Sequence, residues 1–130
     1  LMIGPIDNDT REYRQYTTLT AVGPGTIKSM LRAAENEALV KHVVERFNEL
    51  FNDVQAMQSA RENIVSQSGR KPSIKFEITF EHIDGLQPQD RDEIRNVFFN
   101  AGWTGCTAIA ETHHRFTVMV SDDADKVFPT

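Results

Sequence analysis

The longest stretch of this chain without glycine or proline, Thr26–Ser68, constrains its fold more than any other feature. Residues that favour helix dominate it, chiefly alanine, glutamate, leucine, arginine and glutamine. We expect Thr26 to cap a helix at its start and Gly69 to stop it. One straight helix of this length would measure about 60 Å at 1.5 Å per residue, whereas a compact domain of this size has a radius of gyration of about 14 Å. The helix must therefore break, or extend beyond what its own domain can cover.

The apolar residues of this stretch form two stripes, each with the i, i+3, i+4 spacing of one helix face. At about 100° per residue, the two stripes lie on almost opposite sides of a continuous helix. A break near Ala34–Glu37, with Asn36 capping a second helix, explains both stripes within one molecule. A straight helix that touches its own sheet with one end and a second copy with the other explains them by self-association, and both alternatives stay open. The first stripe comprises Ile27, Met30, Leu31, Ala34 and Ala38, and the second Val40, Val43, Val44, Phe47, Leu50, Phe51, Val54 and Met57.

The second half of the chain, 73–121, predicts the order strand, helix, strand, strand. Its first strand alternates strictly between apolar and polar residues, so we expect one buried and one solvated face. A proline opens the helix and a glycine closes it. The expected ranges are 73–83, 88–101, 103–110 and 115–121, with a hairpin turn at 111–114. The expected buried side chains are Ile74, Phe76, Ile78 and Phe80 in the first strand, Ile94, Val97, Phe98 and Ala101 in the helix, and Phe116, Val118 and Val120 in the last strand.

These elements predict a single α+β domain over residues 1–130. We expect a small three-to-four-stranded mixed sheet, covered on one face by the helical segment 26–68. A strand–helix–strand step usually makes a right-handed crossover, so its two strands should be parallel. Residues 1–12 are expected to form a flexible arm, 13–22 a possible strand, and 122–130 an acidic tail whose Val127 and Phe128 can dock.

Charge and cysteine content limit the classes of function. The net charge of −5 argues against binding to nucleic acid through general phosphate attraction. A single cysteine, Cys106, excludes an internal disulfide and is typical of a reducing, cytoplasmic environment. No stretch approaches the roughly 20 apolar residues that cross a bilayer, so we expect no membrane partner.

The best candidate for chemistry is the predicted hairpin tip, where Glu111, His113, His114 and Arg115 lie close together in sequence. Adjacent histidines beside a carboxylate are suited to acid–base work or to metal binding. Neighbours along a strand point to opposite faces, however, and no HxH, HxxxH or CxxC spacing accompanies them. The sequence therefore favours solvated histidines, and it predicts no metal and no cofactor.

Two other features have simpler readings than a site. Cys106 lies among small residues and matches no protease or redox signature, so it is expected to be an apolar filler. The segment Gly23–Thr26 precedes a helix but lacks the spacing of a P-loop or a dinucleotide fingerprint. We interpret it as a turn followed by a helix start, and we assign no catalytic residue.

The leading hypothesis is a non-enzymatic protein–protein interaction or assembly module, a homodimer whose interface is formed by Ile27, Met30, Leu31 and Ala34. A small accessory protein, including a virus-encoded one that binds another protein, has this composition. One alternative is an enzyme or small-ligand binder that uses the hairpin tip. The other is a nucleic-acid-binding accessory protein.

Overall fold

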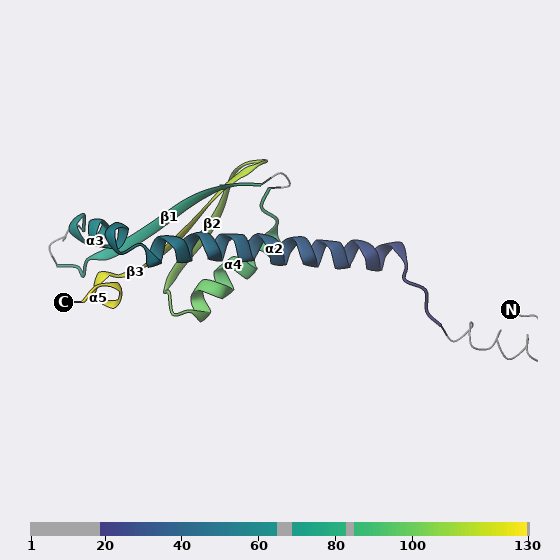
Figure 1. Cartoon of the computed structure of the whole chain (residues 1–130), viewed down its shortest axis with the longest axis horizontal. Helices are drawn as coiled ribbons and strands as arrows, with labels where there is room; N and C mark the ends of the chain where they lie inside the picture. Colours follow the sequence, from purple (N-terminus) through teal and green to yellow (C-terminus); the bar gives the residue numbers. More distant parts are fainter. Residues whose placement is uncertain (1–18, 65–68, 83–84, 130) are drawn as a thin grey trace, which may run out of the picture. The chain divides into compact units, whose positions relative to one another are not determined.

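A computed structural model describes residues 19–64, 69–82 and 85–129. These residues form four helices and a three-stranded antiparallel sheet, which confirms the α+β prediction (Figure 1). The chain falls into two units, Leu1–Ala34 and Glu35–Thr130. The expected arm at 1–12 and most of the possible strand at 13–22 lie outside the described residues, and residues 19–22 form no strand. In chain order the elements are α2 (Pro24–Asn52), α3 (Val54–Glu62), β1 (Ser73–Glu81), α4 (Pro88–Asn100), β2 (Gly105–Thr112), β3 (Arg115–Asp123) and α5 (Ala124–Val127).

The long helical segment consists of two helices, but the break lies at Asp53 and not near Asn36. Asp53 has an extended backbone and caps α3, because its carboxylate accepts a hydrogen bond from the backbone N–H of Ala56 at 3.1 Å. Asn36 instead donates its side-chain amide to Asp90 of α4 at 2.7 Å. Of the two alternatives left open by the sequence, the break at Asn36 is wrong: its side chain bonds to another helix, and the backbone of α2 stays helical through this position.

The start of α2 also differs from the prediction. Thr26 was expected as the cap, but the helix begins at Pro24, two residues earlier. The backbone N–H of Ile27 donates to the carbonyl of Gly23 at 3.1 Å. A proline is well suited to the first turn because the N–H that it lacks would have no helical partner there.

The sheet has the order β1-β3-β2, and β3 is antiparallel to both neighbours. The expected mixed sheet was therefore wrong. β1 and β2 run in the same direction, as a crossover requires, but β3 of the hairpin lies between them. β3 is suited to the centre because Phe116, Val118 and Val120 all point to the covered face and have no exposed surface.

The core lies between one face of the sheet and the helices of the second unit. Phe47 of α2 lies 5.1 Å from Phe98 of α4 and 6.4 Å from Phe80 of β1, measured between ring centroids. Phe51 lies 5.3 Å from Phe76 in an edge-to-face pair. This confirms the expected packing of α2 against β1. The other fully or nearly buried apolar residues of the cluster are Leu39, Val43, Ile94, Cys106, Ala108, Phe116, Val118 and Val120.

The C-terminal segment contributes to the same core. Val127 and Phe128 are partly buried against it, so the expected docking of the tail is confirmed. The backbone N–H of Ala124 donates to the carbonyl of Pro72 at 2.9 Å, which holds the start of α5 beside the start of β1. The tail is shorter than expected because β3 continues to Asp123.

Candidate functional site

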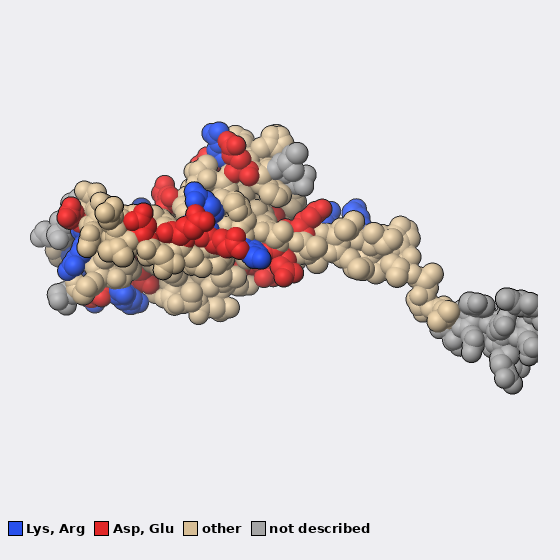
Figure 2. All heavy atoms as spheres, viewed as in Figure 1, with Lys and Arg blue, Asp and Glu red and all other residues tan. Residues whose placement is uncertain are grey.

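The most distinctive surface of the described chain is an apolar stripe at the start of α2. The side chains of Ile27, Met30 and Leu31 are 49%, 62% and 59% exposed, and Ala34 is exposed as well. In Figure 2 the first turns of this helix show surface that is mostly neither acidic nor basic. All four residues predicted as an interface thus share one exposed helix face, and their function as an interface stays a prediction.

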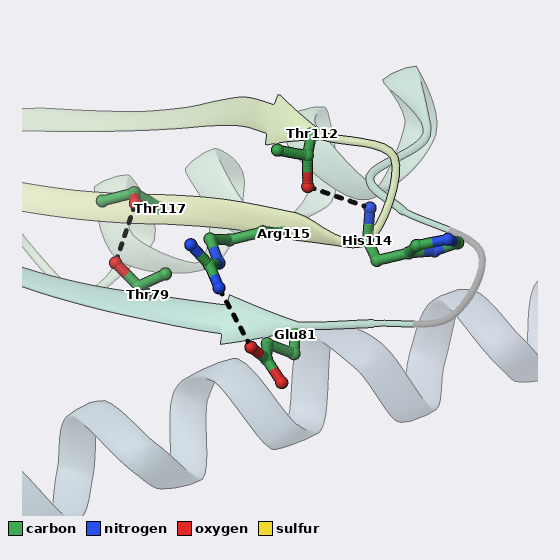
Figure 3. A network of polar contacts seen from close by, with 6 residues as sticks. All are labelled: Thr79, Glu81, Thr112, His114, Arg115 and Thr117. Atoms are coloured by element: carbon green, nitrogen blue, oxygen red, sulfur yellow. Dashed lines mark hydrogen bonds and ion pairs between the residues drawn. The ribbon is translucent and has the colours of Figure 1, made fainter.

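The predicted hairpin site is only partly assembled. A cavity of about 400 Å³ lies where the end of β1 meets the β2–β3 hairpin, and Glu81, His82, Thr112, His114 and Arg115 line it. Figure 3 shows most of this cluster with the threonines that continue it along the sheet. His114 and Arg115 were predicted; Glu111 and His113 were also predicted but do not line the cavity.

Glu111 and His113 are directed elsewhere by the local backbone. The pairing of β2 with β3 is irregular between Ala110 and Thr112, and Glu111 accepts a hydrogen bond from Thr117 at 2.8 Å. The rings of His113 and His114 lie 6.3 Å apart, inclined at 58°. Two imidazoles in this arrangement do not converge on one ion, and the described ranges contain no group of three or more histidine, cysteine or acidic residues able to hold a metal.

Polar contacts already occupy much of the cavity wall. Arg115 forms an ion pair with Glu81 at 3.3 Å, and the backbone N–H of His114 donates to Thr112 at 3.3 Å (Figure 3). The imidazole of His114 extends away from Arg115. His82 donates its backbone N–H to the carbonyl of His114 at 2.8 Å, while its buried Nδ1 has no hydrogen-bond partner among the described residues.

Sequence reasoning missed Glu81 and His82 because it did not pair β1 with the last strand. The register places Glu81 opposite Arg115, so the acid and the base meet across the sheet. The sequence does show opposite charges at these two strand ends, but they predict an ion pair only once the pairing of β1 with β3 is known.

Cys106 has the surroundings of a core residue. Its side chain is buried in β2, and burial raises the pKa of the thiol to about 11, against a smaller lowering by the charge of Arg95. The thiolate is the reactive form of cysteine, and it is scarce at neutral pH when the pKa is this high. The residue serves as the small apolar filler that its sequence context indicated.

Two buried carboxylates stabilise the fold rather than form a site. Asp90 accepts the backbone N–H of Gln87 at 2.8 Å, as part of the cap of α4. Burial of Asp122 raises its pKa, but hydrogen bonds from the N–H of Asp123 and from Thr104 and Lys126 outweigh this, so the pKa is lowered overall. These hydrogen bonds offset the cost of burying the two carboxylates.

A second hollow was not anticipated from the sequence. It has a volume of about 540 Å³ and lies between α3, Trp103 and the C-terminal segment, with Met57 and Phe128 among its walls. The guanidinium of Arg61 crosses toward this segment and donates to the carbonyl of Pro129. Residues distant in sequence form the hollow, so no local pattern indicated it.

The chain matches no known protein-family model, no curated protein and no solved structure. Across the described ranges, every helix is too short or too polar to cross a membrane.

Proposed function

We propose that this protein is a non-enzymatic interaction or assembly module that self-associates through the first turns of α2. The observation that supports this most directly is the exposure of Ile27, Met30 and Leu31, with values between 49% and 62%, on one helix face. Contiguous apolar patches on a protein surface usually mark an interaction site. The same helix buries its next apolar residues in its own core, so the exposed stripe is the part left for a partner.

The energetic gain of such a contact is moderate. Fully burying one large aliphatic side chain stabilises by roughly 1.5–3 kcal/mol, and each copy contributes three such residues that are now about half exposed. Association itself costs about 4–15 kcal/mol in lost motional freedom. The two contributions are of similar size, so the proposed dimer should dissociate on dilution and its formation should depend on protein concentration.

The charge and the cysteine of the chain suit this proposal. A net charge of −5 favours a protein partner over nucleic acid. The single buried thiol of Cys106 is compatible with a reducing cytoplasm.

A small-ligand site at the hairpin end is the second candidate. It is supported by the cavity of about 400 Å³ and by the buried Nδ1 of His82, which has no hydrogen-bond partner among the described residues. The ion pair between Arg115 and Glu81 weakens this candidate, because it neutralises the one guanidinium that a ligand anion would use.

The proposal is tested by measuring the mass of the full chain by sedimentation equilibrium over a range of concentrations. The wild type should dimerise, and Leu31→Glu should be monomeric with unchanged circular dichroism. Ser29→Glu is the matched control, since it adds the same charge to the same helix away from the stripe and should dimerise like the wild type. A wild type that stays monomeric at high micromolar concentration would refute the proposal.

A further inference from the structure

We infer that the partner of this stripe is the same segment of a second copy, packed antiparallel about a two-fold axis between Arg32 and Ala33. The inference rests on the proposed self-association and adds its geometry. Three properties of α2 lead to it: the spacing of its exposed apolar residues, their order of size, and the charges beside them. Each property separates an antiparallel pair from a parallel one or from an unrelated partner.

The spacing is that of a coiled-coil seam. Ile27, Leu31, Ala34 and Ala38 follow one another at intervals of four, three and four residues, which is the a/d repeat that packs one helix against another. All four lie in the continuous helix α2 and are exposed. We call these four residues the seam.

The seam has a defined end. The next two positions of the repeat are Lys41 and Glu45, whose charged groups lie 3.9 Å apart and whose side chains are 75% and 58% exposed. Charged residues at these positions do not continue an apolar contact. From Leu39 onward the apolar residues of α2 turn to its own core. The contact between two copies is therefore limited to the segment 27–38.

The order of size favours an antiparallel pair. The two large seam residues come first and the two alanines last. Antiparallel packing about the stated axis sets Ile27 opposite Ala38 and Leu31 opposite Ala34, so every layer holds one large and one small side chain. A parallel pair would set large against large and alanine against alanine, which forces the helices apart at one end and leaves voids at the other.

The flanking charges favour the same arrangement. Lys28 and Glu35 each follow a seam residue by one position, and within the described residues neither forms an ion pair. In the antiparallel pair Lys28 of each copy lies beside Glu35 of the other, so the two-fold axis creates two ion pairs. In a parallel pair the residues beside Lys28 and Glu35 are Gly23 and Met30, which carry no charge. Opposed helix dipoles add to the preference.

Charge exchange tests the pairing in the full-length protein. In a dimer of Lys28→Glu, both contacts between positions 28 and 35 bring two carboxylates together. In a dimer of Glu35→Lys, both contacts bring two ammonium groups together. Each variant should dimerise severalfold more weakly than the wild type. An equal mixture of the two variants restores both opposite-charge pairs, so it should form a heterodimer severalfold tighter than either variant alone. Effects within one helix are the same in the mixture as in the separate samples, and they cancel. A mixture no tighter than the separate variants would overturn the antiparallel geometry.

Cysteine cross-linking tests the direction of the helices. Ile27→Cys and Ala38→Cys are prepared separately, oxidised alone and then as an equal mixture. In the antiparallel pair the two copies of position 27 are offset by roughly 16 Å along the axis, whereas a disulfide needs Cα atoms within about 7 Å. Neither variant should cross-link alone, and the mixture should give the disulfide-bonded dimer. The wild type is the control for Cys106, which is buried.

The outcomes separate the geometry from the proposed function. A wild type that never dimerises refutes both. A wild-type dimer in which Ile27→Cys cross-links to itself refutes the antiparallel arrangement and leaves self-association standing. A wild-type dimer with no cross-link in any sample, mixture included, refutes the seam as the contact.

Discussion

The two ends of α2 carry similar apolar patterns, but their side chains have opposite environments. At the start of the helix, Met30 and Leu31 are 62% and 59% exposed. Four turns later, Val43 and Phe47 have no exposed surface. Both ends have the spacing of an amphipathic face, so the pattern alone does not determine whether a stripe is buried. The presence of the sheet and of α4 determines it.

The comparison separates two effects: local propensity makes the segment helical, whereas tertiary packing decides which of its side chains are buried. The backbone of α2 is continuous because its residues favour helix throughout. Within the second unit, α2 is anchored by the hydrogen bond of Asn36 to Asp90 and by Phe47 in the aromatic cluster. A helix of good propensity can therefore carry an exposed apolar face in its first turns and a buried one further along.

The largest expected effect contrasts the two ends directly. Phe47→Ala should lower the free energy of unfolding by about 3–5 kcal/mol, because it leaves a cavity among packed rings. Leu31→Ala should leave the free energy of unfolding of the monomer almost unchanged, since that side chain is exposed. Urea unfolding at low protein concentration measures both. Equal losses would mean that the start of α2 is packed within the monomer.

Acid should weaken the packed unit through Asp122. Replacing this carboxylate by the amide in Asp122→Asn should cost about 1–3 kcal/mol, because the two carboxylate oxygens accept the backbone N–H groups of Asp123 and Thr104, and the amide keeps only one acceptor oxygen and sets an NH2 group against the other N–H. The folded pKa lies below the unfolded value, so the stabilisation is complete above about pH 4 and is lost as the pH falls through the folded pKa. Thermal midpoints between neutral pH and pH 2 should fall less steeply for the variant. Asp125→Asn is the control, since Asp125 is half exposed and forms its ion pair with the exposed Lys71.

A smaller effect is expected where α2 is first anchored. Asn36→Ala removes the hydrogen bond to Asp90 and should lower the free energy of unfolding by about 1 kcal/mol. Alanine is the better helix former, so helix content by circular dichroism should not fall. Glu37→Ala, at an exposed position next to it, should be close to neutral. A loss of helix content in Asn36→Ala would show that this bond maintains the helix itself.

The smallest effect is expected at the hairpin turn. His113 and His114 are both exposed, so His113→Ala and His114→Ala, singly and together, should leave the free energy of unfolding and self-association nearly unchanged. Loss of a binding activity without loss of stability in the double variant would favour the ligand-binding alternative over the assembly module.

Local patterns predicted most of the secondary structure. Strict alternation placed β1, and proline and glycine bounded α4, because these signals act within a few residues. The break at Asp53 was missed because an aspartate within a helical run can be either an exposed helix residue or a cap. Its extended backbone in the structure shows that it is a cap. The mixed sheet was wrong for a related reason: which strand occupies the centre depends on long-range packing of Phe116, Val118 and Val120.

The candidate sites divide in the same way. The exposed stripe of α2 was predictable because helix periodicity places Ile27 and Leu31 on one face. The cavity at the hairpin end was not, since it requires the register between Glu81 and Arg115. Likewise, the turn brought His114 but not Glu111 to the cavity because of the irregular pairing at Ala110 and Thr112.

The central position of β3 has a consequence for synthesis of the protein. β1 and β2 both leave the ribosome before β3, the strand that pairs with each of them. The hydroxyl of Thr79, for example, bonds to that of Thr117, which is synthesised 38 residues later. Until then Phe76 and Phe80 have no neighbouring strand, and such unpaired apolar segments are prone to aggregate. Contacts between distant residues also slow folding. The nascent chain should therefore stay protease-sensitive and chaperone-dependent until β3 emerges, and then fold in one cooperative step.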